Sequence, residues 1–334
     1  MKAYGLFAIK RLLQLFLVVF LGVSGVFQVT QLSPIDPVEN MMRQRIGRSN
    51  FSPEAEAALR AKLTEMLGVD VPMWQQYVSF LKNLTTGDMG PSLAAFPTPV
   101  MKIVLRALPW TLGLLFTSVI ITWTVGNLLG GLAGYFQKNP FFKLFGVLSI
   151  GIQPIPYYII AFILLMIFGI FWTVLPINGG AGMFVKPGWN IHYILSILHH
   201  SILPAGSIVL GGFGMWFLGM RALVSNIVTE DYVTYAEMGG VEKKKIVGSY
   251  VIRNALLPQL TALAMVLGGV FSGTVITEEV FGYPGLGRLL IQAIDMGDYV
   301  LVVAVGSISV AAVATSIFVI DLLYPLLDPR VRAN

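Results

Sequence analysis

The chain contains no cysteine among its 334 residues, and it has few charged residues. Without cysteine it has no disulfides, no thiol chemistry and no cysteine-ligated metal. Only 12% of the residues are charged, whereas 56% are hydrophobic and the mean hydropathy is +0.77. A chain of this length and composition is not an ordinary soluble domain. We expect it to cross a membrane several times.

Motifs of common enzyme chemistry are also missing from the sequence. It has no Walker A motif, so it does not bind ATP by that route, and it has no HExxH, GxSxG or paired catalytic carboxylates. The apolar runs contain no acidic or basic residue except Arg221 and Asp321, each at one end of its run. Carriers driven by ion gradients generally need ionisable groups or unwound helices in mid-membrane. We therefore expect no catalytic residues, and an energy source outside the chain.

Six apolar runs define the expected architecture, an all-α polytopic membrane protein. Their approximate bounds are 12–29, 108–135, 144–175, 201–224, 257–277 and 299–324. Pro154 and Pro156 interrupt the third run and predict a break, which is tolerated where protein or a water-lined cavity satisfies the freed carbonyls. An ordinary proline kink is the alternative interpretation. The candidates for lining a translocation path are Gln153, Tyr157, Tyr158 and Trp216.

The segment between the first two runs has a different composition. Residues 31–106 are rich in charged residues, proline and glycine, so we expect this segment to be helical and to lie in water. Ser52 as N-cap and Pro53 at the first helical position predict a helix to Leu67, and a second helix at about 74–83 is expected to pack on it. The predicted division is a first span at 1–30, the aqueous segment at 31–106, and a core of five spans at 107–334 with a polar loop at 225–258.

The polar loop carries the sequence DYVTYAEMGGVEKKKIVGSYVIRNALLP, which begins at Asp231. Two short helices are predicted, with Asp231 capping the first and Gly239 and Gly240 allowing a turn before the second. Tyr232 and Tyr235 share one face with Gly239 at helical spacing. A compact polar knob with an aromatic side suits docking into a groove on a soluble partner.

This loop resembles the cytoplasmic EAA loop of permease subunits in ATP-binding-cassette importers. The variant is that of the B-type subunits of the oligopeptide and dipeptide (peptide/nickel, binding-protein-dependent) family. The matching residues are Asp231, Tyr232, Val233, Ala236, Gly240 and Arg253 to Pro258. Two further family motifs match at Glu279 to Arg288 and in the LLDPRVR run at 326–332. Glu237, Met238 and Gly239 depart from the pattern usual in peptide permeases, which bears on the substrate and not on the role of the loop.

The resemblance implies a type I importer permease core and a set of partners. These are a second homologous permease subunit, two cytoplasmic ATPase subunits that hold ATP and Mg, and an extracytoplasmic solute-binding protein. Membrane lipid is a further expected partner, whereas no cofactor, metal or nucleic acid is expected on this chain. The segment at 31–106 either docks the binding protein or serves as a spacer. The residues expected to couple to the ATPase are Asp231, Tyr232, Tyr235, Ala236, Glu237, Gly239, Gly240, Val241 and Lys243.

The same resemblance implies an importer of oligopeptides or dipeptides. Oligosaccharides or nickel chelates are alternative substrates for this importer type, and a secondary transporter is a rival from another class. The positive-inside rule favours a cytoplasmic N-terminus, because this orientation places Lys243 to Lys245 and most other basic residues of the short loops inside. The predicted location is the prokaryotic cell (inner) membrane, with multiple spans and both termini in the cytoplasm.

Overall fold

The computed structural model describes residues 2–32, 38–39, 42, 52–67, 70–268 and 275–327. Over these residues the chain is helical, and the sole extended pairing described is an isolated bridge between Pro91 and Pro99. The elements are α1 (Lys2–Gln31), α3 (Pro53–Leu67), α4 (Met73–Thr86), α5 (Val100–Tyr135), α6 (Pro140–Ile152), α7 (Tyr157–Leu164), the π-helix η1 (Leu165–Phe171), α8 (Ile191–Ile227), α9 (Asp231–Met238), α10 (Lys243–Lys245), the π-helix η2 (Ile246–Ile252), α11 (Arg253–Gly268), α12 (Val275–Val280), α13 (Leu286–Asp295) and α14 (Tyr299–Leu327).

The helices confirm the expected fold class of a polytopic all-α membrane protein. Within the described residues, five helical segments are long and apolar enough to cross a membrane, and a bent pair raises the number to as many as six. The bent pair is α6 with α7 and η1, whose axes meet at 106°. The break lies at Gln153 to Pro156, where the two prolines of the third apolar run predict it.

The helices are longer than the apolar runs that predict them. The 36 residues of α5 correspond to about 54 Å of helix, whereas the hydrocarbon core is about 30 Å thick. Lys102 and Arg106 therefore belong to α5 rather than to the preceding loop. Helix α8 likewise begins before the fourth apolar run, at Ile191, where the Asn190 side chain accepts a hydrogen bond from the Tyr193 N–H at 2.8 Å. A hydropathy run marks the lipid-facing part of a helix and misses its polar ends.

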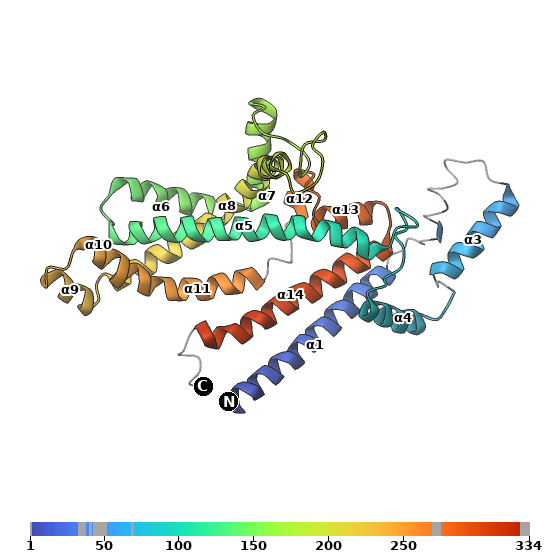
Figure 1. Ribbon diagram of the computed structural model, residues 1–334, viewed down its shortest axis with the longest axis horizontal. Helices are drawn as coiled ribbons and strands as arrows, with labels where there is room; N and C mark the ends of the chain where they lie inside the picture. Colours follow the sequence, from blue (N-terminus) through green and yellow to red (C-terminus); the bar gives the residue numbers. More distant parts are fainter. Residues whose placement is uncertain are drawn as a thin grey trace.

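Helices α5 and α8 form the main pair of the bundle (Figure 1). Gly126, Gly130 and Gly134 recur every fourth residue on the side of α5 that faces α8. A methyl group at Gly126 would lie 2.6 Å from Cβ of Trp216, and one at Gly130 would collide with the backbone carbonyl of Phe217. The absence of side chains at these positions lets the two backbones approach closely, as the small-residue stripe predicts.

A second pair, α1 and α14, runs side by side along the bundle (Figure 1). Arg11 on α1 and Asp321 on α14 form an ion pair, with 3.2 Å between Nη1 and Oδ2. Two opposite charges that pair near a helix end avoid the cost of an isolated charge in lipid. Asp321, one of the two charged residues in the apolar runs, therefore has a structural role.

The described part of the segment at 31–106 packs differently from our expectation. Helix α3 begins as predicted, with Ser52 Oγ accepting from the Ala55 N–H at 3.3 Å. However, the hydrogen bonds and ring contacts described between α4 and another helix are with α1, and the side chains of α3 that the structure describes are almost all exposed (Figure 1). The Tyr77 hydroxyl lies 2.5 Å from Ser24 Oγ, and the Tyr77 ring lies 5.4 Å from that of Phe27. Sequence spacing alone does not reveal which helix α4 covers.

Candidate functional site

The candidate site is the elbow, which we define as residues 231–245 between α8 and η2. Its first helix, α9, begins at Asp231, with Glu230 at the N-cap and no side-chain capping bond. The prediction that Asp231 caps this helix is therefore wrong by one residue. Asp231 lies in the first turn instead, where a carboxylate interacts favourably with the helix dipole.

A Schellman-type turn ends α9 and reverses the chain. Gly240 has a φ of +70°, which an L-residue with a side chain rarely adopts. The Gly240 N–H donates to the Glu237 carbonyl at 3.1 Å, and the Val241 N–H donates to the Ala236 carbonyl at 3.1 Å. These are the two bonds of the motif, with Val241 packing beside the turn it closes. The turn predicted at the glycine pair is present, and Gly240 is the residue that needs left-handed geometry.

Apolar contacts fix the elbow to the spans. Val233 and Ala236 on α9 are buried, with exposures of 1% and 9%. They belong to one cluster with side chains from α8, η2 and α11, and these are Met220, Val224, Ile246, Val251 and Ala255. The half-buried Val241 packs against the same cluster. Ala236 and Val241 therefore contact this chain itself, and whether Val241 also contacts a partner stays a prediction.

Polar contacts reinforce this attachment. The Tyr232 hydroxyl accepts from Asn254 Nδ2 at 3.2 Å. The Tyr135 hydroxyl, at the end of α5, donates to Glu237 Oε1 at 3.4 Å. Lys243 Nζ lies 5.9 Å from the centre of the Tyr135 ring, within the range of a cation–π interaction. The elbow is thus joined to α5 and α11 as well as to α8.

One side of the elbow remains uncovered in this chain. Tyr235 is 72% exposed, Met238 is 80% exposed and Tyr232 is 40% exposed. Gly239 and Gly240 are also exposed, so a partner can approach the backbone there. Exposed large aromatic and methionine side chains on a well-anchored helix are typical of protein-binding surfaces. The coupling role of Tyr232, Tyr235, Gly239 and Gly240 stays a prediction.

The predicted pathway residues do not form one surface. Gln153 and Tyr157 lie at the bend between α6 and α7, where they contact α8 at Gly214 and Gly211. Tyr158 is the half-buried neighbour of Tyr157. Trp216 is only 3% exposed and packs against Gly126 of α5. The structure therefore corrects the grouping, because Trp216 fills the interface between α5 and α8, whereas the other three lie at the bend.

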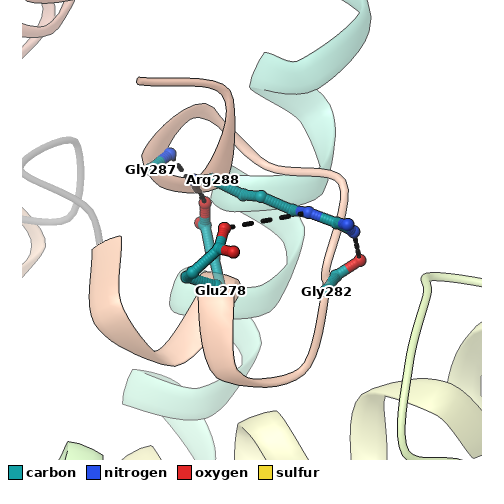
Figure 2. Close-up of polar contacts among 5 residues, drawn as sticks. Glu278, Gly282, Gly287 and Arg288 are labelled. Atoms are coloured by element: carbon teal, nitrogen blue, oxygen red, sulfur yellow. Dashed lines mark hydrogen bonds and ion pairs between the residues drawn. The ribbon is translucent and has the colours of Figure 1, made fainter. Parts of the chain in front are cut away.

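A second polar centre, which the sequence did not single out, surrounds Glu278. This residue is 0% exposed, and its carboxyl accepts from the Thr111 hydroxyl and from the Gly287 N–H, both at 2.7 Å. Figure 2 shows the carboxyl pointing at the backbone of Gly287, while Arg288 reaches the Gly282 carbonyl with Nη1. We call residues 278–288 the clasp, because their turn is fixed to α5 through Thr111.

The clasp also contacts α8 and the loop before it. Tyr283 is 3% exposed, and its hydroxyl lies 3.1 Å from Ser201 Oγ on α8. The Tyr283 ring meets the Trp110 ring edge-on, with centres 5.6 Å apart. The Gly179 N–H donates to the Phe281 carbonyl at 3.0 Å. The clasp therefore joins α5, α8 and α13 at the end of α5 that lies farthest from the elbow.

Burial controls the electrostatics of the clasp. Desolvation raises the pKa of the Glu278 carboxyl above its ordinary value of 4.5, although the donors from Thr111, Gly287 and Arg288 lower it. Arg288 approaches Glu278 through its backbone N–H, at 3.3 Å, whereas its guanidinium lies near Glu279, with 3.9 Å between Oε2 and Nε. The sequence feature that could have indicated this buried acid is the pair Glu278 and Glu279, directly after an apolar run. Our family motif began at Glu279 and so missed the buried acid one residue earlier.

Comparisons with known proteins place the chain among membrane transport components. Residues 126–333 match the family described as "Binding-protein-dependent transport system inner membrane component". The chain is 32% identical to the di/tripeptide transport system permease protein DppB of Pseudomonas aeruginosa, over 97% of this chain and 98% of that protein. It is 30% identical to the dipeptide transport system permease protein DppB of Escherichia coli K12, over 97% and 98%.

A third relative is the oligopeptide transport system permease protein AppB of Bacillus subtilis. It is 27% identical, over 94% of this chain and 95% of that protein. The matched region includes the elbow and the clasp, and the full-length relatives also cover α1 and the segment that contains α3 and α4. The chain belongs to the family of binding-protein-dependent transport system inner membrane components, as a B-type permease subunit of the oligopeptide and dipeptide branch.

Proposed function

We propose that this chain is the membrane-spanning permease subunit of an ATP-driven, binding-protein-dependent importer of short peptides. The observation that carries this proposal is the similarity, over nearly the whole chain, to permeases named for dipeptides, di/tripeptides and oligopeptides. The reported relatives are all named for peptides, so they favour peptides over oligosaccharides or nickel chelates as the substrate. The chain is a transport subunit and not an enzyme.

The complete transporter contains four other kinds of component in this proposal. A second homologous permease completes the membrane part, and two cytoplasmic ATPase subunits hold ATP and Mg. A solute-binding protein delivers the peptide from outside, and lipid surrounds the spans. The basic residues of the short loops support an orientation in which both termini and the elbow face the cytoplasm, whereas the segment at 31–106 lies outside.

The elbow transmits movement in this proposal through its attachments. Its buried side chains and polar contacts reach α5, α8 and α11. If the exposed face of α9 is held in a groove of the ATPase, a shift of that groove moves the ends of three spans together. Rigid-body motion of packed helices is a common way to alternate between inward-facing and outward-facing states. Of the predicted coupling residues, Tyr235 is the side chain most available on the exposed face, and we add Met238, which the sequence did not single out, because it is 80% exposed beside it.

The test is uptake by purified components in proteoliposomes. With both permeases, the ATPases and the binding protein present, we expect uptake of labelled Ala-Phe that requires ATP. With this chain alone, we expect no uptake when a proton or sodium gradient is imposed. Uptake by the chain alone under an ion gradient would contradict the proposal and support the secondary transporter. ATP-driven uptake of an oligosaccharide but not of Ala-Phe would reject the peptide assignment alone.

A further inference from the structure

A groove lies beside the clasp, between the first turns of α5 and helix α13. Its volume is about 390 Å³, which falls within the usual range of small-molecule sites, roughly 300–1,000 Å³. Pro284 and Gly285 of the clasp line it. The wall residues on the two helices are Ile103, Arg106, Ala107 and Trp110 from α5, and Arg288, Leu289 and Gln292 from α13.

The wall residues lie where helical geometry gathers them. On α5 they recur at intervals of three and four residues, and on α13 Arg288 and Gln292 are four residues apart, so each helix turns one face to the groove. The clasp fixes the distance between these faces, since Thr111 of α5 accepts a hydrogen bond from the Leu286 N–H at 2.7 Å. The groove is therefore built on anchored backbone.

The charges in the groove favour an anion. Its lining includes two guanidinium groups and no carboxylate. Arg288 is held in place by the Gly282 carbonyl and lies 3.9 Å from Glu279. Arg106 is exposed, and within the described part of the chain it forms no ion pair. Its donors are free for a ligand, and guanidinium groups bind carboxylates well.

The remaining lining residues favour a ligand that is only partly polar. Ile103, Leu289 and the Trp110 ring provide apolar surface next to the two arginines. A ligand with a carboxylate beside an apolar group matches both the arginines and the apolar surface. The C-terminal residue of a short peptide is such a ligand when its side chain is apolar. We propose that the groove receives the C-terminal residue of a short peptide, with Arg106 as the main ligand of its carboxylate. This proposal rests on the proposed function. It adds that the permease subunit itself, and not only the solute-binding protein, binds the peptide.

The test uses the cysteine-free sequence. The sample is the assembled transporter without binding protein. Gln292→Cys introduces the single thiol of this chain, and this thiol lies in the groove. Its labelling by a maleimide is measured on this subunit after the subunits have been separated. Millimolar Ala-Phe should slow the labelling, whereas Ala-Phe amide, which lacks the carboxylate, should protect far less. Adding Arg106→Gln should weaken the protection by Ala-Phe by about tenfold, the effect of losing one charge-assisted hydrogen bond.

The matched control is Lys102→Gln, which removes a positive charge from the same helix one turn before Arg106, at a residue that does not line the groove. We expect protection by Ala-Phe to persist in this variant. Equal labelling with and without Ala-Phe, or equal protection by the acid and the amide, would overturn the proposal. Protection by the binding protein alone would instead make the groove a protein-docking surface and would also overturn it. Failure of the proposed function looks different, because the complete transporter would then show no ATP-driven uptake of Ala-Phe.

Discussion

Replacing Tyr235 by aspartate is expected to abolish ATP-driven peptide uptake and to uncouple ATP hydrolysis from the binding protein. Tyr235 is the most exposed aromatic residue of the elbow, at 72%, and large aromatic side chains at the centre of an interface often contribute about 2 kcal/mol or more to binding. A buried, unpaired aspartate would add a desolvation cost. We expect stimulated hydrolysis and uptake to fall by more than about thirtyfold.

The fold should survive this change, which separates coupling from stability. Substitutions of exposed side chains usually change the free energy of unfolding by no more than about 0.5 kcal/mol. The level of the protein in the membrane and its thermal unfolding midpoint should therefore match those of the unmodified chain. Tyr235→Phe is the matched control, and we expect it to keep most of the uptake because it retains the ring. Normal coupling in Tyr235→Asp would refute the docking role of α9.

The second large effect is expected at Glu278, where substitution by alanine should destabilise the clasp. It would leave the Thr111 hydroxyl and the Gly287 N–H buried without their acceptor. Each buried donor without a partner costs about 1–3 kcal/mol. We expect a total loss on the order of 3 kcal/mol, seen as a fall of roughly 5–10 °C in the thermal unfolding midpoint of the purified protein.

Its neighbour provides the control for this prediction. Glu279→Ala removes an acid whose side chain is 44% exposed and whose distance to Arg288 is 3.9 Å. Exposed ion pairs contribute about 0–1 kcal/mol, so this variant should unfold almost as the unmodified chain does. Glu278→Gln keeps one oxygen acceptor and should lie between the two alanine variants. Similar losses for the two alanine variants would show that the carboxyl of Glu278 does not stabilise the clasp.

Local patterns predicted much of the architecture and of the elbow. Lipid requires long apolar runs, so the spans follow from composition, and the two prolines predict the break between α6 and α7. The glycine pair at 239–240 predicts the turn, because left-handed backbone geometry strongly favours glycine. Helix ends were predicted less well, since polar residues such as His199 and His200 continue α8 beyond the apolar run.

Contacts between distant parts of the chain were beyond the reach of these patterns. Thr111 and Glu278 are 167 positions apart, and nothing in the local sequence around either residue indicates that they meet. The same holds for α4, where Tyr77 contacts a residue 53 positions away on α1. Trp216 is an aromatic residue in an apolar run and was therefore a candidate for the pathway. It instead packs against Gly126 of α5 in a helix interface. Of the motif at 326–332, residues 328–332 lie outside the described residues.

The central claim is that the elbow receives movement from an ATPase subunit on the cytoplasmic side. The most direct measurement is photo-crosslinking in membranes that contain the whole transporter, with benzoylphenylalanine in place of Tyr235 and, separately, in place of Trp189. Trp189 is fully exposed just before α8, whereas the elbow follows the other end of that helix. We predict that the probe at position 235 crosslinks to the ATPase subunit and that the probe at position 189 does not. Crosslinking of the ATPase from position 189, or none from position 235, would contradict the account.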